Sequence, residues 1–126
     1  MILFVVPAYN EELNIARLIQ ETSAFCVKRN QEWRLFVVDD GSRDRTAEVL
    51  HKNSQDLPVS LVSYQPNRGV QEAFRRGFKA ALDVAKEHDV IVTMEADGTA
   101  DLELIPRFLE AIQSGANAYL KRNFTT

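Results

Sequence analysis

Ile2-Leu3-Phe4-Val5-Val6 is a continuous run of apolar residues near the start of the chain, and Pro7 follows it. A short run of this kind is typical of a strand that is covered on both faces, as strands of parallel sheets are. We expect Pro7 to end the strand. From Glu11 onward the spacing changes to the three-and-four repeat of one helix face, formed by Ile15, Leu18, Ile19, Thr22, Phe25 and Cys26. The beginning of the chain therefore predicts a strand followed by an amphipathic helix.

This alternation of strand and helix patterns continues along the chain. Further strands are expected at residues 33–38, 59–64 and 90–94, and residues 118–120 have the pattern of a fifth. Further helices are expected around residues 47–50, over 70–85 and over 105–112, the last ended by Gly115. Such alternation joins the strands by right-handed crossovers into a parallel sheet. The sequence predicts one doubly wound α/β domain over residues 1–126, with a mostly parallel sheet and helices on both faces.

The composition limits what the chain binds and where it works. With 45% hydrophobic and 26% charged residues it has the make-up of a globular protein. A net charge of −3 gives no reason to expect the basic face that nucleic acid requires, so we expect no nucleic-acid partner. Cys26 is the only cysteine, which excludes an internal disulfide and fits a reducing cytoplasm. The apolar run at residues 2–6 is far shorter than a membrane span. We expect a cytoplasmic chain, with attachment to the cytoplasmic face of a membrane in a longer parent protein left open.

Polar residues gather where the predicted strands end. The four strand ends carry residues 7–12, 39–42, 65–69 and 95–98. In a parallel sheet these ends meet at the same edge, and open α/β sheets bind their ligands along that edge. Three of the segments bring carboxylates, whose mutual repulsion is costly unless a cation lies among them. We therefore expect a positive charge at this edge, although each loop alone is explained equally well as a turn.

Glu95 and Asp97 are the candidate metal ligands. They are two residues apart, so in an extended segment both side chains leave on one side while Ala96 points away. Carboxylate oxygens without a nearby histidine or cysteine favour Mg²⁺ or Mn²⁺, and these ions typically bridge protein carboxylates to substrate phosphates. The pattern predicts a diphosphate ligand. The alternative is that Asp97-Gly98 is only a turn and Glu95 only solvated. The sequence contains neither the glycine-rich signature of dinucleotide-binding proteins nor that of P-loop proteins.

Four ordered motifs resemble those of family 2 glycosyltransferases of the GT-A fold, and in particular the dolichyl-phosphate-mannose-synthase-like branch. They are residues 5–12, residues 37–46, Asn67-Arg68-Gly69 and Glu95-Ala96-Asp97, the last followed by Asp101 and Leu104-Ile105-Pro106. The resemblance runs nearly end to end. It implies that the chain is the Rossmann-like nucleotide-binding half of such an enzyme. It would bind a UDP- or GDP-linked sugar and transfer the sugar to a lipid-phosphate or saccharide acceptor.

The resemblance also implies a donor-nucleotide site made of Pro7, Tyr9, Glu11, Asp39, Asp40 and Arg68. Pro7, Tyr9 and Glu11 would line the nucleoside pocket, and Asp39 would accept a hydrogen bond from the base. A ring that packs on Tyr9 and Pro7, with a carboxylate at its edge, is a usual way to hold a planar base. Asp40 would help with the ribose or only shape the turn. Arg68 would lie near the donor or be an ordinary surface residue.

The metal motif departs from the family pattern in one position. The family usually has Asp-x-Asp, whereas Glu95 occupies the first position here. The extra methylene keeps the charge and the oxygen ligands but moves them outward by about one bond, so Asp97 is the firmer ligand. In this family the metal would neutralise the departing nucleotide diphosphate.

Length is the larger departure, because family members continue well beyond residue 126. The chain therefore reads as the N-terminal part of a longer glycosyltransferase, and no catalytic base is identified in it. One alternative is a non-catalytic fragment that binds a nucleotide sugar without transferring it. Another is a haloacid-dehalogenase-type phosphatase, because residues 95–99 also resemble the D-x-D-G-T motif of that family. Glu95 at the nucleophile position, and the late position of the motif, argue against the phosphatase.

Overall fold

The computed structural model describes residues 1–99 and 101–113. Strands and helices alternate along this part of the chain, in the order β1 (Ile2–Ala8), α1 (Ile15–Lys28), β2 (Trp33–Asp40), α2 (Thr46–Asn53), β3 (Val59–Tyr64), α3 (Val70–Val84), β4 (Val90–Thr93), the 3₁₀ helix η1 (Leu102–Leu104) and α4 (Ile105–Gln113). The predicted order of elements is confirmed. Gly115 and the strand expected at residues 118–120 lie outside the described residues.

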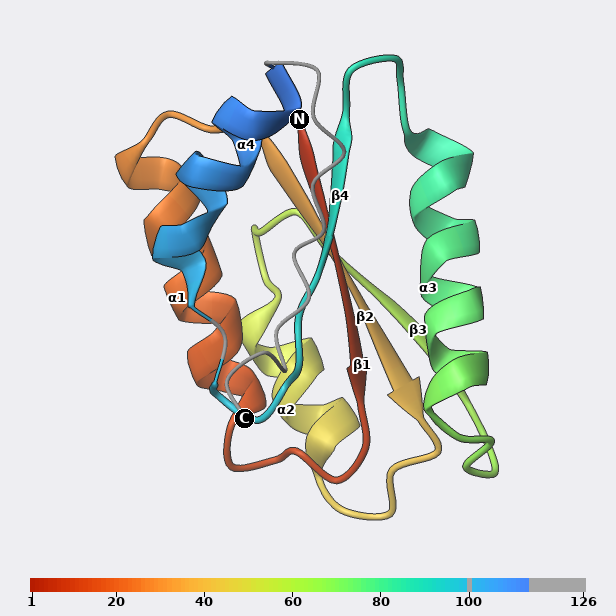
Figure 1. Cartoon of the computed structure of the whole chain (residues 1–126). Coiled ribbons are helices and arrows are strands. Elements are labelled where there is room, and N and C mark those ends of the chain that lie inside the picture. The colour runs from red at the N-terminus through yellow and green to blue at the C-terminus, as the bar shows by residue number, and fades with distance from the viewer. Residues whose placement is uncertain (100, 114–126) are drawn as a thin grey trace.

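The strands form one parallel sheet in the order β3-β2-β1-β4 (Figure 1). β1 lies inside the sheet, where Ile2 stands opposite Trp33 of β2 on one side and opposite Val90 of β4 on the other. This inner position accounts for the apolar sequence of β1, because its side chains are covered on both faces. The strand order reverses at β1, since β2 and β3 are added on one side and β4 on the other. Doubly wound sheets bind their ligands at such a reversal.

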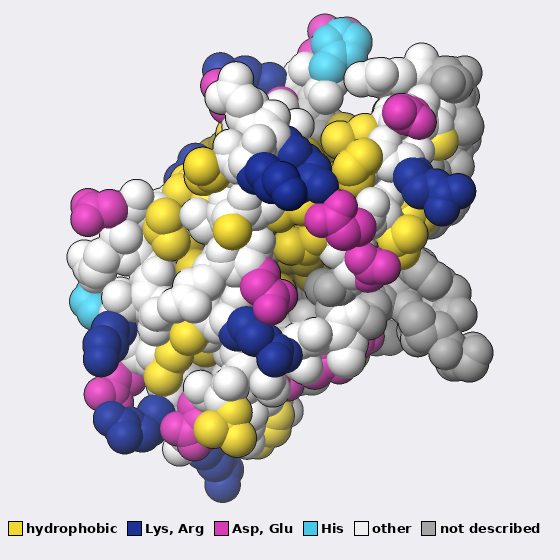
Figure 2. Space-filling view, turned by 90° about the vertical axis from the view of Figure 1, so that its left-hand side faces the viewer, with side chains coloured by type: hydrophobic (Ala, Val, Ile, Leu, Met, Phe, Trp, Pro, Cys, Tyr) yellow, Lys and Arg dark blue, Asp and Glu magenta, His cyan; other side chains and the backbone are white. Residues whose placement is uncertain are grey.

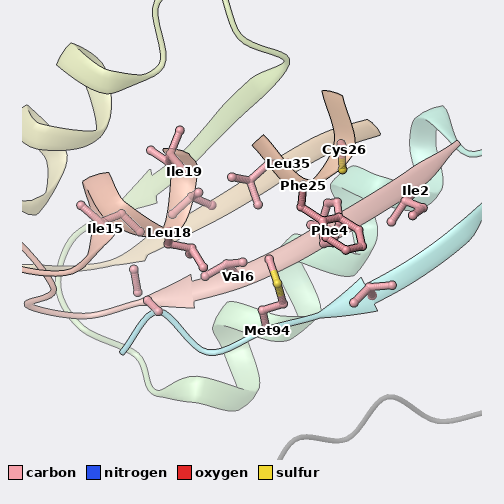
Figure 3. Packing of buried hydrophobic residues seen from close by; sticks show 14 of the residues in the cluster. Ile2, Phe4, Val6, Ile15, Leu18, Ile19, Phe25, Cys26, Leu35 and Met94 are labelled. Carbon is pink, nitrogen blue, oxygen red and sulfur yellow. The ribbon is translucent and has the colours of Figure 1, made fainter. Parts of the chain in front are cut away.

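Helices cover both faces of the sheet, as predicted. α1, α2 and α4 lie on one face and α3 on the other (Figure 1). Alternate side chains of β1 belong to different clusters. Phe4 and Val6 are buried with Leu18 and Ile19 of α1 (Figure 3), whereas Val5 packs on the α3 side. Full burial of one such side chain stabilises the fold by about 1.5–3 kcal/mol. The two clusters hold the sheet firmly beneath the polar loops at its edge.

Pro7 does not end β1, which continues to Ala8, so that prediction is wrong. On the β4 side of β1, the hydrogen-bond ladder is already finished at Pro7. β4 ends at Thr93, and the Met94 N–H then donates to the Val5 carbonyl at 3.1 Å. Successive residues of a parallel strand direct their N–H groups to alternate neighbours, so the N–H that Pro7 lacks would face the β4 side. The missing N–H of Pro7 therefore interrupts no hydrogen bond between β1 and β2.

The side of the molecule that carries α1 and α4 has a mixed surface. Figure 2 shows basic and acidic side chains interspersed on it, with apolar side chains between them. One such pair joins Arg29 at the end of α1 to Glu103 of η1 at 2.8 Å, and the Arg29 guanidinium lies 3.9 Å from the centre of the Phe25 ring. Among the described residues, no helix has both the length and the apolar character needed to cross a membrane.

Candidate functional site

A cavity of about 280 Å³ opens at the carboxyl edge of the sheet, where the strand order reverses between β1 and β4. Its described lining consists of Pro7, Ala8, Tyr9, Glu11, Asp40, Val70, Phe74, Glu95, Ala96 and Asp97. Six of the eight predicted site residues are in this set. Asp39 and Arg68 are not among the described lining residues. The loop after β1 and the segment after β4 thus meet around one space, although more than 80 residues separate them in the sequence.

One wall of the cavity is apolar. The Tyr9 side chain is 43% exposed, and α3 contributes Val70, which is 58% exposed, and Phe74. A flat apolar group can pack against such side chains while its polar rim reaches the carboxylates around them. The sequence placed Val70 and Phe74 only on the core face of a helix. The position of Val70 in the sequence could have indicated its place in the cavity. Val70 begins the helix that follows a strand-end loop, so it lies at the carboxyl edge of the sheet.

Asp39 is buried within its own turn, with 3% of its surface exposed. Its Oδ1 accepts a hydrogen bond from the Ser42 N–H at 3.1 Å. Asp39 pairs in register with Ala8 of β1, so it lies one residue from the strand end that leads into the Tyr9 loop. A hydrogen bond from Asp39 to a base stays a prediction.

Asp40 is equally buried, at 4% exposure, and it organises the loop after β3. Its Oδ1 accepts the Arg68 N–H at 2.8 Å. Its Oδ2 accepts the Gly69 N–H at 3.0 Å and the Asn67 side-chain amide at 2.8 Å. Gly41, with a φ of 69°, lets the chain turn here, since a Cβ at this position would overlap the backbone of Asn67. Asp40 therefore shapes the loop, while one part of it also borders the cavity.

Arg68 takes part in this arrangement through its backbone. Its N–H is one of the donors to Asp40, and its side chain is exposed. Placement of the guanidinium near a bound donor stays a prediction.

The distribution of these hydrogen bonds corrects the argument for a cation. The sequence argument counted every carboxylate at the strand ends as an uncompensated negative charge. Asp39 instead receives an N–H donor from its own loop, and Asp40 receives two from the loop after β3. Hydrogen bonds to the charged form stabilise it without a metal. The predicted metal ligands Glu95 and Asp97 differ from these two residues in being exposed.

Glu95 and Asp97 are both exposed, whereas Ala96, which lies between them in the sequence, is only 4% exposed. The segment is not an extended strand, because β4 ends at Thr93 and residues 96–97 form a turn. Asp97 Oδ1 accepts the Thr99 N–H at 3.0 Å and also the Thr99 hydroxyl. Asp97 thus belongs to a turn, as the alternative expected, and still lines the cavity with Glu95.

This donor set fits Mg²⁺ or Mn²⁺ better than zinc. Among the described residues, no group of three or more His, Cys, Asp or Glu side chains is arranged to hold a metal. Two carboxylates would leave most of the coordination to water and to oxygens of a ligand. Mg²⁺ in particular keeps several waters and is bound by one or two carboxylates together with substrate phosphates.

The loops after β1 and β2 are joined by an interloop latch, which the sequence did not reveal. The latch consists of Asn10, Ser42, Asp44 and Thr46. The Asn10, Glu11 and Glu12 N–H groups donate to Ser42 Oγ, Thr46 Oγ1 and Asp44 Oδ2 at 2.9, 2.8 and 3.3 Å. In return, Asn10 Oδ1 accepts the N–H of residue 43 at 2.9 Å. The latch side chains lie within residues 37–46 and 5–12, motifs that were read for fold and donor contacts only.

Asp44 is the ionised member of the latch. Burial raises the pKa of its carboxyl, but hydrogen bonds from the Thr46 hydroxyl, the Thr46 N–H and the Glu12 N–H outweigh that effect. The pKa of Asp44 therefore lies below its ordinary value. The carboxylate is charged at neutral pH and accepts all of these donors.

Comparison with known proteins identifies the family of this chain. A family model described as glycosyl transferase family 2 matches residues 3–123, nearly the whole chain. The chain belongs to glycosyl transferase family 2. The match includes residues 95–99, so their similarity to the phosphatase motif carries no weight for this family 2 chain. The narrower dolichyl-phosphate-mannose-synthase-like branch stays a prediction.

Proteins similar to this chain are known from sequence and from structure. An undecaprenyl-phosphate 4-deoxy-4-formamido-L-arabinose transferase of Pectobacterium atrosepticum is 37% identical over 113 residues, covering 88% of this chain and 33% of that protein. Glucosyl-3-phosphoglycerate synthase from Mycobacterium tuberculosis, crystallised with Mn²⁺, UDP-glucose and phosphoglyceric acid, matches with a TM-score of 0.66 at 25% identity, covering 91% of this chain and 40% of that one. S. aureus TarS in complex with UDP matches in fold, with a TM-score of 0.66 at 21% identity over 86% of this chain and 32% of that one.

The family 2 chain described here spans about a third of the length of the curated relatives it matches. These solved neighbours share its parallel sheet with flanking helices, so the predicted fold class is confirmed. The Mycobacterium tuberculosis neighbour was crystallised with Mn²⁺ and a UDP-sugar, and TarS with UDP.

Proposed function

We propose that this chain is the donor-binding part of a family 2 glycosyltransferase, which transfers the sugar of a nucleoside-diphosphate sugar to a lipid-phosphate acceptor. The observation that carries the proposal is the cavity between β1 and β4. It places an apolar wall formed by Tyr9, Val70 and Phe74 beside the outward carboxylates Glu95 and Asp97. A nucleotide needs an apolar surface for its base, and its diphosphate needs positive charge.

The donor would be held by two kinds of contact. The base packs against Pro7 and Tyr9, with Glu11 at the rim and Asp39 accepting a hydrogen bond at its edge. Glu95 and Asp97 hold Mg²⁺ or Mn²⁺, which supplies positive charge to the pyrophosphate of the donor. UDP is the preferred nucleotide in this proposal, since structural neighbours were crystallised with UDP or UDP-glucose. A GDP-linked donor is the alternative.

The acceptor is proposed from the relatives, whose names specify an undecaprenyl phosphate. A phosphate is already anionic, so its attack on the sugar needs no general base. A lipid acceptor would place the chain at the cytoplasmic face of a membrane. The part that binds the acceptor would be supplied by the additional length that the relatives have, and the chain alone would bind the donor without turnover.

Nucleotide binding tests the proposal. Isothermal calorimetry of the full chain with UDP, UDP-glucose and GDP, each with and without Mn²⁺, should show Mn²⁺-dependent binding of the UDP compounds. Replacing Asp97 with asparagine removes one carboxylate of the pair, and we expect the Mn²⁺ dependence to be lost. Asp83→Asn is the matched control, because Asp83 is exposed on α3 and does not line the cavity. Absence of nucleotide binding by the wild type would refute the donor site, and unchanged Mn²⁺ dependence in Asp97→Asn would refute the metal assignment.

A further inference from the structure

We propose that Thr46, with Ser42 and Asp44, positions the nucleoside-binding loop at residues 9–12 by fixing its backbone, without itself touching the nucleotide. This inference rests on the proposed function, since it concerns the loop that carries Tyr9 and Glu11. None of Thr46, Ser42 and Asp44 is among the described residues that line the cavity. Their effect on binding would therefore pass through the loop.

The loop depends on the latch for its backbone hydrogen bonds. Three consecutive N–H groups, those of Asn10, Glu11 and Glu12, donate to side chains from the loop after β2. Asn10 also has a φ of 53°, in the left-handed region that residues other than glycine adopt at some cost. These N–H groups are therefore held from outside the loop, while the Glu11 carbonyl accepts the Asn14 and Ile15 N–H groups of the turn that leads into α1. Removing the acceptors would free the loop to relax.

Thr46 is the central residue of the latch. It is the first residue of α2, and none of its surface is exposed. Its hydroxyl oxygen accepts the Glu11 N–H at 2.8 Å. The same hydroxyl donates its hydrogen to Asp44 Oδ1, because an N–H can only donate and a carboxylate can only accept. The orientation of the Thr46 hydroxyl is thus determined, and with it the position of Glu11.

Asp44 and Ser42 hold the residues on either side of Glu11. Asp44 receives the Thr46 donors on Oδ1 and the Glu12 N–H on Oδ2. Ser42 Oγ receives the Asn10 N–H. The loop is therefore held at three successive residues, immediately after the cavity-lining Tyr9. A shift of the loop would move both Tyr9 and Glu11 at the cavity wall.

The test compares variants that differ by one hydroxyl. Thr46→Val keeps the size of the side chain but removes the acceptor for Glu11, whereas Thr46→Ser keeps the hydroxyl. Thr22→Val is the matched control, because Thr22 is also fully buried and its hydroxyl donates only to the Leu18 carbonyl within α1, at 2.7 Å. UDP affinity in Mn²⁺ is measured by calorimetry at a temperature where every variant is folded. Hydrogen exchange of the amides at residues 10–12 is measured on the same proteins.

A positioning role predicts that only the variants that remove a latch hydroxyl lose UDP affinity. Thr46→Val should weaken UDP binding by on the order of tenfold, the effect expected when a buried N–H loses its acceptor, and should speed amide exchange at residues 10–12. Thr46→Ser should restore both properties to near the wild-type values. Thr22→Val should leave the dissociation constant of UDP unchanged. Ser42→Ala, which removes the acceptor of Asn10 alone, serves if Thr46→Val fails to fold, and it should weaken binding in the same direction.

Two failures are distinguishable. If the wild type binds UDP and the folded Thr46→Val variant binds it equally well, the positioning role is wrong and the proposed function stands. A serine variant that binds as weakly as the valine variant would also overturn the inference, because the hydroxyl would then not be the group that matters. If the wild type binds no nucleotide, the proposed function itself has failed.

Discussion

Replacing Asp40 with asparagine isolates the role of this buried carboxylate in shaping the loop after β3. Asp40 Oδ1 accepts the Arg68 N–H, while Oδ2 accepts the Gly69 N–H and the Asn67 amide. Asparagine has a single side-chain oxygen, so in either orientation its NH₂ group faces at least one of these donors. A buried donor without an acceptor costs about 1–3 kcal/mol, and the bonds that remain lose the strength given by the negative charge. We expect Asp40→Asn to lower the free energy of unfolding by about 2–4 kcal/mol.

Urea and thermal unfolding followed by circular dichroism measure this loss, which corresponds to a fall in Tm of roughly 10 °C for a domain of this size. Asp39→Asn is the matched control. Asp39 is as buried as Asp40, but its Oδ1 accepts one N–H, that of Ser42, and an asparagine oxygen can still accept it. We expect this control to cost about 1 kcal/mol or less. The reasoning is refuted if Asp40→Asn destabilises the chain no more than Asp39→Asn does.

Two further predictions concern α3. Val70→Ala should leave Tm nearly unchanged, because Val70 is 58% exposed. It should weaken UDP binding by a few-fold, because it removes part of the apolar wall. Calorimetry that finds equal affinity would contradict the place of Val70 in the site. Hydrogen bonds from Arg75 and Arg76 lower the pKa of Glu72 from 4.5 to about 2, so its carboxylate stabilises the folded state above pH 4.5, and this contribution is lost as the pH falls toward 2. Glu72→Gln should therefore flatten the fall of Tm over that pH range, and a Tm profile parallel to that of the wild type would count against the pairing.

The fold could be predicted because its signals are local. The apolar run of β1 and the three-and-four spacing of α1 and α3 can be read within one segment, and strands that alternate with helices give a parallel sheet. The end of β1 could not be read in this way. β1 continues through Pro7 because Pro7 and Ala8 pair with Val38 and Asp39 of β2, and this pairing cannot be read within one segment.

The site was predictable in its location but not in its internal bonding. The rule that parallel strands end at one edge brought Tyr9, Glu95 and Asp97 together correctly. It could not show that Asp40 receives N–H groups from a loop 27 to 29 residues away, which weakens the electrostatic argument for a cation. The latch was missed for the same reason, since Thr46 and Glu11 are 35 residues apart and their contact depends on how two loops cross.

The two faces of the sheet differ in how securely they are covered. Of the helices in the part of the chain that the structure describes, α3 alone packs on the face that carries Leu3, Val5 and Phe36. A local unfolding event that releases α3 would expose that whole apolar face to solvent, and aggregation can start from such an exposed apolar surface. The hydrogen bonds of Asp40 fasten the segment that leads into this helix. We therefore expect the loss of these bonds to make release of α3, and with it aggregation, more frequent.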